Sequence, residues 1–151
     1  MIRHYLLVAL LPALAMAAVS FTACPNGAPT PATLTVNDCS GDVCNLYAGQ
    51  HISAVASGIV SPADSASVAA HISAFLGGLD LGFEIPPHLA DACAVGIEGG
   101  CPLSAGMTFS YSLNADSLEA PARGVPVEIE VGLIGDGGVA LACLRFNAVV
   151  N

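Results

Sequence analysis

The sequence contains no tryptophan and no lysine, and only 10% of its 151 residues are charged. Its basic side chains are Arg3, Arg123 and Arg145, which stand against twelve aspartates and glutamates. Nucleic acids and heparin-like polymers are bound by many cations that displace counterions, and anionic membrane surfaces attract the same residues. The sequence therefore argues against these partners. An acidic surface fits a soluble extracellular protein or one that works in an acidic lumen.

Long apolar runs are also scarce. The apolar run from Tyr5 to Leu14 follows a short basic start and is followed by the small-residue pattern Ala15-Met16-Ala17. This run is far shorter than the ~20 residues that span a bilayer, and the pattern is typical of a cleaved secretory leader. We expect a signal peptide over residues 1–17 and one mature domain over residues 18–151, with no stable membrane insertion.

The chain has six cysteines, an even number behind a predicted leader, which indicates three disulfides formed in an oxidising compartment. Six cysteines allow 15 pairings. Spacing favours two local bridges, Cys39 with Cys44 and Cys93 with Cys101, and leaves Cys24 to meet Cys143. A zinc site would use C-x2-C pairs or clusters of cysteine and histidine. Neither pattern is present, so we expect no metal site.

Alternation of apolar and polar residues predicts short strands separated by turns rich in Gly, Pro, Asp and Ser. About seven strands and no long helix predict an all-β, immunoglobulin-like two-sheet β-sandwich with three disulfides. A Gly-Gly pair at 137–138, after Asp136, predicts the hairpin turn before the last strand. The predicted strands are Leu34 to Cys39, Gln50 to Val60, Ala66 to Leu76, Leu79 to Ile85, Phe109 to Leu113, Val125 to Leu133 and Val139 to Val150.

The stretch from Ala66 to Leu76 is ambiguous because its alanines also favour a helix. Its short length and the Gly77-Gly78 break that follows favour a strand with a hairpin-like connection. This strand would carry His71, a histidine in an otherwise apolar setting.

Catalytic patterns do not emerge from the sequence. There is no G-x-S-x-G elbow, and His51, His71 and His88 are scattered without the spacing of a metal or nucleophile site. Glu128 and Glu130 share one face of a predicted strand, where we expect a solvated outer row rather than a carboxylate pair across a cleft. We therefore expect no enzyme activity and no cofactor.

Apolar residues make up 54% of the chain although aromatic residues make up only 5%. A sandwich of this size can bury these side chains in a close-packed core or enclose a cavity between its sheets. Composition alone favours the ordinary core.

Several motifs together resemble the ML lipid-recognition domain, particularly Niemann-Pick type C2 proteins and group 2 mite allergens. The order of the six cysteines is one of them, and the sequence from Gly135 to Cys143 is especially similar to that of the mite allergens. The other motifs are Leu46-Tyr47-Ala48-Gly49-Gln50, Phe83-Glu84-Ile85-Pro86, Cys101-Pro102-Leu103 with Gly106, and Thr108-Phe109-Ser110-Tyr111.

The resemblance implies disulfides 24–143, 39–44 and 93–101, and sheets that splay apart to hold a sterol, a fatty acid or a similar apolar ligand. Members of this group are non-enzymatic carriers. Where the sterol-carrier branch has a proline-valine pair at the pocket mouth, this chain has Asp116-Ser117, so the resemblance leaves the ligand open. The residues it places at the pocket are Phe83, Leu81, Ile52, Ala54, Phe109, Tyr111, Val131 and Leu144.

We therefore expect a secreted, monomeric lipid carrier that is extracellular or resides in the endolysosomal lumen. Two alternatives remain open at this stage. One is an extracellular interaction or immune-recognition protein with a solid interior. The other is a carrier of semiochemicals, which would differ from a sterol carrier only in its ligand.

Overall fold

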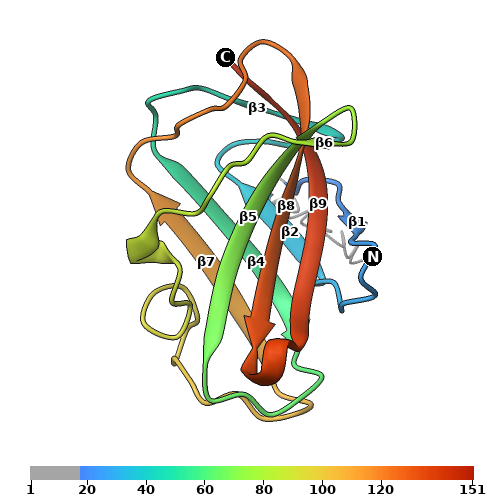
Figure 1. Cartoon of the computed structure of the whole chain (residues 1–151), viewed down its shortest axis with the longest axis vertical. Helices are drawn as coiled ribbons and strands as arrows, with labels where there is room; N and C mark the ends of the chain where they lie inside the picture. The colour runs from blue at the N-terminus through green and yellow to red at the C-terminus, as the bar shows by residue number, and fades with distance from the viewer. Residues whose placement is uncertain (1–17) are drawn as a thin grey trace, which may run out of the picture.

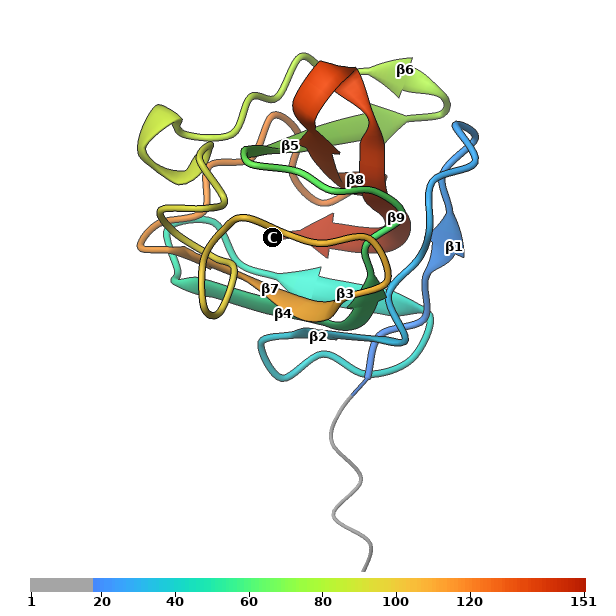
Figure 2. The same cartoon turned by 90° about the horizontal axis from the view of Figure 1, so that it is seen from below.

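The computed structural model describes residues 18–151, and the predicted signal peptide, residues 1–17, lies outside the described residues. Two β-sheets pack face to face (Figure 1), and the view from below shows them as two layers (Figure 2). Regular helix over residues 18–151 is limited to two single 3₁₀ turns, η1 (Pro87–Leu89) and η2 (Asp136–Gly138). No helix in the described part is long and apolar enough to cross a membrane.

One sheet has six strands. Its main path runs in the order β1-β9-β8-β5-β6, and β3 pairs with β9 in parallel at the same edge as β1. The other pairs of this sheet are antiparallel. The strands are β1 (Thr22–Ala23), β3 (Val43–Leu46), β5 (Val68–Leu76), β6 (Leu79–Asp80), β8 (Pro126–Gly135) and β9 (Ala140–Val150).

The other sheet has three antiparallel strands in the order β2-β4-β7. The predicted all-β sandwich is confirmed: its nine strands over residues 18–151 include two, β1 and β6, of only two residues each. The segment from Ala66 to Leu76, which the sequence left ambiguous between helix and strand, contains strand β5. The strands of this sheet are β2 (Thr33–Val36), β4 (Ile52–Val60) and β7 (Thr108–Ala115).

A bulge in β4 sets which of its side chains face inward. The register of the β4–β7 pair shifts between Ala56 and Ile59, and Gly58 within the bulge has φ +70°. A Cβ at Gly58 would lie 2.6 Å from the Cβ of Ala32, so both the backbone angle and the close approach require glycine. Because the bulge adds a residue, Ala56 and Ile59 are both buried.

The segment from Leu79 to Ile85 corrects one sequence prediction. The hairpin is present, because Gly77 and Gly78 form the turn between β5 and β6 with positive φ angles. The strand, however, ends at Asp80 rather than continuing to Ile85. The Asp80 carboxylate accepts a hydrogen bond from the Gly82 N–H at 2.9 Å and turns the chain away from the sheet.

Three disulfides join the cysteines as spacing and the resemblance predicted. Cys24–Cys143 attaches the N-terminal segment to β9 and joins cysteines 119 positions apart. The other two bridges close short loops, because Cys39 and Cys44 are 5 positions apart and Cys93 and Cys101 are 8 positions apart. Their Cα–Cα distances of 5.2 to 5.6 Å are ordinary for disulfides.

Candidate functional site

A cavity of about 610 Å³ lies between the two sheets. This volume falls within the ~300–1,000 Å³ range of small-molecule sites. The walls come from both sheets and are aliphatic or aromatic. The residues that line it from the strands are Leu34, Val36, Leu46, Ile52, Ala54, Ala56, Ile72, Ala74, Tyr111, Leu113, Ala115, Val127, Ile129, Val131, Leu144, Phe146 and Val150.

The cavity occupies only one half of the sandwich. In the three-stranded sheet, its inner end lies where Ala56 on β4 is paired with Tyr111 on β7. In the six-stranded sheet, it lies where Val131 on β8 is paired with Ile72 on β5 and with Leu144 on β9. Beyond this level the inward side chains fill the space between the sheets. That packed half includes Ile59, Val68, Leu103, Phe109, Leu133 and Leu141, all at most 5% exposed.

Small side chains explain why this half is hollow. The inward positions of β4 include Ala54 and Ala56, and Ala74 on β5 and Ala115 at the end of β7 also line the cavity. Each alanine occupies a place that a larger side chain would fill in a close-packed interior. The alanine content that made β5 ambiguous in the sequence thus contributes directly to the cavity.

Two loops surround the mouth of the cavity. One runs from residue 83 to 89 and includes η1, and the other runs from residue 116 to 122 between β7 and β8. The second loop is held against the chain before β4 by two backbone hydrogen bonds of 2.9 Å, from Gly49 to Leu118 and from Leu118 to Gln50. All lining residues with ionisable side chains other than Tyr111 come from these loops: Glu84, His88, Asp116 and Glu119.

The structure brings six of the eight predicted pocket residues together around the cavity, namely Phe83, Ile52, Ala54, Tyr111, Val131 and Leu144. Phe109 is not a lining residue. It faces inward from β7 like Tyr111, but it lies one inward step deeper, in the packed half. Leu81 is not a lining residue either, and its N–H donates to the Ala74 carbonyl at 2.8 Å behind the wall.

Sequence reasoning missed most of the mouth and part of the walls. Val127 and Ile129 precede Val131 on the same face of β8, and Leu34 and Val36 alternate inward on β2. The period-two pattern contained this signal. The second mouth loop, in contrast, has no periodicity from which its position could be predicted.

Tyr111 is the polar side chain at the inner end of the cavity. It is only 3% exposed, and burial raises the pKa of its phenol to about 12. The ring packs so closely on Gly96 that a Cβ there would lie 2.5 Å from the ring. With Leu89 and Leu113, Tyr111 also separates the cavity from a smaller hollow, which Val95 and Asn114 line. This hollow lies at the edge of β7 where the Ser112 N–H donates to the Gly96 carbonyl at 2.9 Å.

The outer face of the six-stranded sheet carries an ionic cluster, where we expected only a solvated row. Arg145 on β9 donates from Nε to Glu130 at 2.9 Å and from Nη1 to Glu128 at 3.0 Å, and its guanidinium lies 4.6 Å from the centre of the Phe75 ring. The Glu130 side chain is 14% exposed. Its hydrogen bond to Arg145 raises the pKa of the guanidinium further, so the arginine stays charged.

The imidazole of His71 joins this cluster, with Nε2 3.3 Å from Glu130. Its register partner on β8 is Gly132, where a Cβ would overlap the imidazole ring. The absence of a side chain at 132 therefore lets the ring lie across β8 toward the glutamate. This cluster lies on the side of the sheet opposite the cavity.

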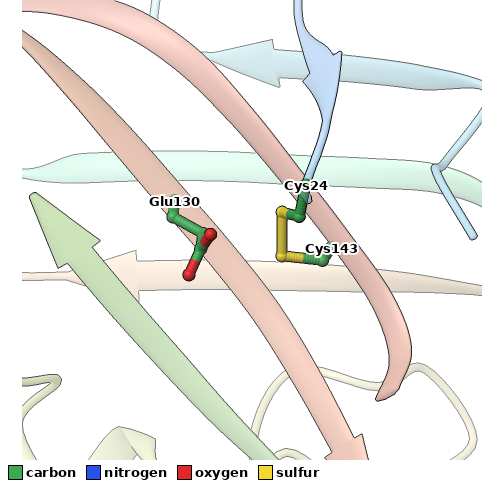
Figure 3. Close-up of side chains that lie close together, drawn as sticks. All are labelled: Cys24, Glu130 and Cys143. Atoms are coloured by element: carbon green, nitrogen blue, oxygen red, sulfur yellow. A yellow bond between two sulfur atoms is a disulfide. The ribbon is translucent and has the colours of Figure 1, made fainter. Parts of the chain in front are cut away.

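Cys24, Cys143 and Glu130 lie close together on this same face (Figure 3), with their potential ligand atoms within 4.8 Å of one another. The two sulfur atoms are bonded to each other, and metal binding by cysteine requires the thiolate. The Glu130 carboxylate is already bound by Arg145. The disulfide therefore attaches the N-terminal segment to β9, and the ion pair beside it joins β8 to β9.

Comparison with known proteins places this architecture in a family. The model of the ML domain matches residues 18–150. The chain belongs to the ML domain family. One similar protein is the NPC intracellular cholesterol transporter 2 from Canis lupus familiaris, which is 30% identical over 126 residues. The aligned residues cover 83% of this chain and 80% of that protein. The mite group 2 allergen Tyr p 2 from Tyrophagus putrescentiae is 28% identical over 151 residues, 99% of each chain.

Solved structures share the ML sandwich. A Niemann-Pick type C2 protein from Japanese carpenter ant superimposes with a TM-score of 0.67 at 18% identity, over 87% of this chain and 99% of that one. Chicken MD-1, in a complex with lipid IVa, gives a TM-score of 0.55 at 16% identity, over 84% and 85% of the two chains. At these identities the similarity supports the fold.

Proposed function

We propose that the protein is a secreted, non-enzymatic carrier of a sterol, a fatty acid or a similar apolar lipid. The observation that carries this proposal is the apolar cavity of about 610 Å³ between the sheets. Membership of the ML domain family supports it. So do the names of two similar proteins, since one is an intracellular cholesterol transporter and the other holds lipid IVa.

The physical basis of binding would be removal of the ligand's apolar surface from water. Burying roughly 300 Å² of that surface at ~25 cal/mol per Å² supplies about 7 kcal/mol before the entropic costs of association. The aliphatic walls from both sheets provide such an environment. Phe83, Ile52, Ala54, Tyr111, Val131 and Leu144 would contact the ligand directly.

A carrier role fits the chemistry of the cavity better than catalysis does. Its ionisable groups other than Tyr111 lie in the mouth loops, and its inner walls are hydrocarbon. The His71–Glu130 pair lies on the opposite side of the sheet and would not reach a bound ligand. Three disulfides support an oxidising location, outside the cell or in the endolysosomal lumen.

The cavity also bears on the alternatives. An interaction protein with a solid interior would have the space between its sheets filled, which a void of this size does not favour. A semiochemical carrier would use the same cavity, and only the bound molecule distinguishes it. One chain encloses the whole cavity, so a monomer would suffice for binding.

Extraction of bound lipid tests the proposal. The protein is purified from the medium of cells that secrete it, and its organic extract is analysed by mass spectrometry. We expect a stoichiometric apolar molecule. We also expect Phe83→Asp to abolish loading, because a carboxylate would enter the cavity wall, whereas Val139→Asp on the exposed β8–β9 turn should not. A protein that is reproducibly empty and binds neither fluorescent sterols nor fatty acids would disprove the carrier role.

A further inference from the structure

The cavity has polar groups at both ends and hydrocarbon between them. At the mouth these are ionisable side chains of the two loops, and at the inner end the lining residue with a polar side chain is Tyr111. Tyr111 lies at that end because it is the register partner of Ala56, the last alanine of β4 that lines the cavity. A ligand that fills the chamber would therefore reach Tyr111 with the end that enters first.

The Tyr111 hydroxyl accepts and donates no hydrogen bond to another side chain or to the backbone of residues 18–151. No side-chain polar atom in this part of the chain is both fully enclosed and unpartnered. The hydroxyl therefore borders open space although the residue is only 3% exposed. Buried tyrosine hydroxyls usually find a partner, and one supplied by a ligand would satisfy it.

Charge restricts what that partner can be. Burial raises the pKa of Tyr111 to about 12, so the phenol is neutral at physiological pH. Neither Arg123, which follows the mouth loop, nor Arg145, on the outer face, lines the cavity. A ligand carboxylate at the inner end would be desolvated without a cation to pair with it, which is costly.

A carboxylate left at the mouth would be unfavourable as well. Glu84, Asp116 and Glu119 line that end, and His88 is the single basic side chain among the lining residues. The carboxylates of the mouth would repel a ligand carboxylate, and solvent and salt at the exposed mouth would weaken this repulsion without reversing its sign. Both ends of the cavity thus disfavour a lipid anion.

We propose that the cavity selects an uncharged lipid with a hydroxyl or carbonyl oxygen at the end that enters first, and that the Tyr111 hydroxyl hydrogen-bonds this oxygen. The inference rests on the proposed carrier function and narrows its ligand to neutral lipids such as alcohols, ketones and esters. Tyr111 is then a specificity-determining residue, because its hydroxyl stabilises a ligand oxygen at a depth where the other walls are hydrocarbon.

Two lipids of equal chain length test the proposal, hexadecanol and hexadecanoate. The affinity of each lipid is measured at neutral pH by its displacement of N-phenyl-1-naphthylamine, an oxygen-free fluorescent dye. The measurement is made on the wild-type protein and on the variants Tyr111→Phe and Tyr47→Phe. Tyr47 is the matched control because it is 52% exposed and does not line the cavity. Dye binding by Tyr111→Phe also shows that this variant retains a folded cavity.

We expect the wild-type protein to bind hexadecanol at least about tenfold more tightly than hexadecanoate, since an unpaired buried charge costs more than a neutral hydrogen bond. Tyr111→Phe should weaken hexadecanol between about twofold and about tenfold, which is the range for one neutral hydrogen bond. It should leave the dye unaffected, and Tyr47→Phe should change neither.

Equal affinity of the wild-type protein for both lipids would overturn the selection of neutral ligands. Unchanged hexadecanol affinity in Tyr111→Phe would show that the hydroxyl is solvated from the smaller hollow beside β7 instead, and would overturn its role. In both cases the carrier function stands. If neither the dye nor either lipid binds to the wild-type protein, the carrier function fails and this inference fails with it.

Discussion

Tyr111 on β7 lies directly opposite Ala56 on β4, and both side chains face the cavity. A large and a small residue are thus paired at the level where the hollow half of the sandwich meets the packed half. Two positions from Ala56 on the same face, Ala54 is paired with Leu113. The volume that these alanines leave open is the volume that a ligand would occupy.

Filling that volume with a larger side chain should weaken ligand binding. We expect Ala54→Phe to weaken lipid binding by at least about tenfold, because the ring would occupy the cavity without displacing a close-packed neighbour. Val60→Phe, on the same strand but 51% exposed, is the matched control. Dye displacement measures both variants, and thermal unfolding checks that they are folded. Full binding by Ala54→Phe would contradict the position of the ligand.

Alkaline stability should depend on Tyr111. Burial raises its pKa from 10.0 to about 12, so above pH 10 the unfolded chain loses this proton before the folded protein does. The free energy of unfolding should therefore fall between pH 10 and about 12, by about 2 to 3 kcal/mol from this group. Urea titrations at several pH values measure the decrease. Tyr111→Phe should flatten it and Tyr47→Phe should not, and equal slopes in the two variants would refute the assignment.

Acid should loosen the turn between β8 and β9. The Ser67 hydroxyl, followed by the Ala66 N–H, holds the pKa of Asp136 below its usual value. Stability from this carboxylate is present above about pH 4 and is lost as the pH falls through the lower folded-state pKa. The protection of the Ala66 and Ser67 amides against hydrogen exchange, measured relative to the intrinsic rate at each pH, should therefore fall below pH 4. Asp136→Asn should show this lower protection already at neutral pH, and unaltered protection would contradict the prediction.

The disulfides should contribute unequally to stability. Cys24–Cys143 spans 119 residues and Cys39–Cys44 spans 5. In the chain-entropy view, the long loop gives about 5 kcal/mol and the short one about 2 kcal/mol. Paired Cys→Ser variants measured by urea unfolding should show this order. A larger loss from the 39–44 pair would indicate that native contacts of that loop, rather than loop entropy, dominate.

Much of the fold follows from period-two patterning. The alternation from Val125 to Leu133 correctly predicts β8 because one face of the strand is buried and the other carries acids. The same alternation from Leu79 to Ile85 was misleading. There Phe83 and Ile85 face the cavity from a loop, so apolar spacing reflects burial rather than sheet hydrogen bonding.

The depth of a residue along the cavity is harder to predict. Phe109 and Tyr111 are two residues apart on one strand and both face inward, yet only Tyr111 lines the cavity. Alternation reports which side of a sheet a residue occupies and contains no information on how far the opposite sheet has separated. The two mouth loops depend on tertiary contacts such as the Gly49–Leu118 hydrogen bond, which local sequence does not specify.

The division of the sandwich into a solid half and a hollow half bears on the unloaded protein. Side chains such as Ile59, Leu103 and Leu141 are buried entirely by other parts of the chain, so their packing persists whether or not the chamber is occupied. Covalent bridges secure the same scaffold at both termini and at two turns. We therefore expect the protein without a ligand to keep its tertiary structure, so that release of a bound molecule would not require unfolding.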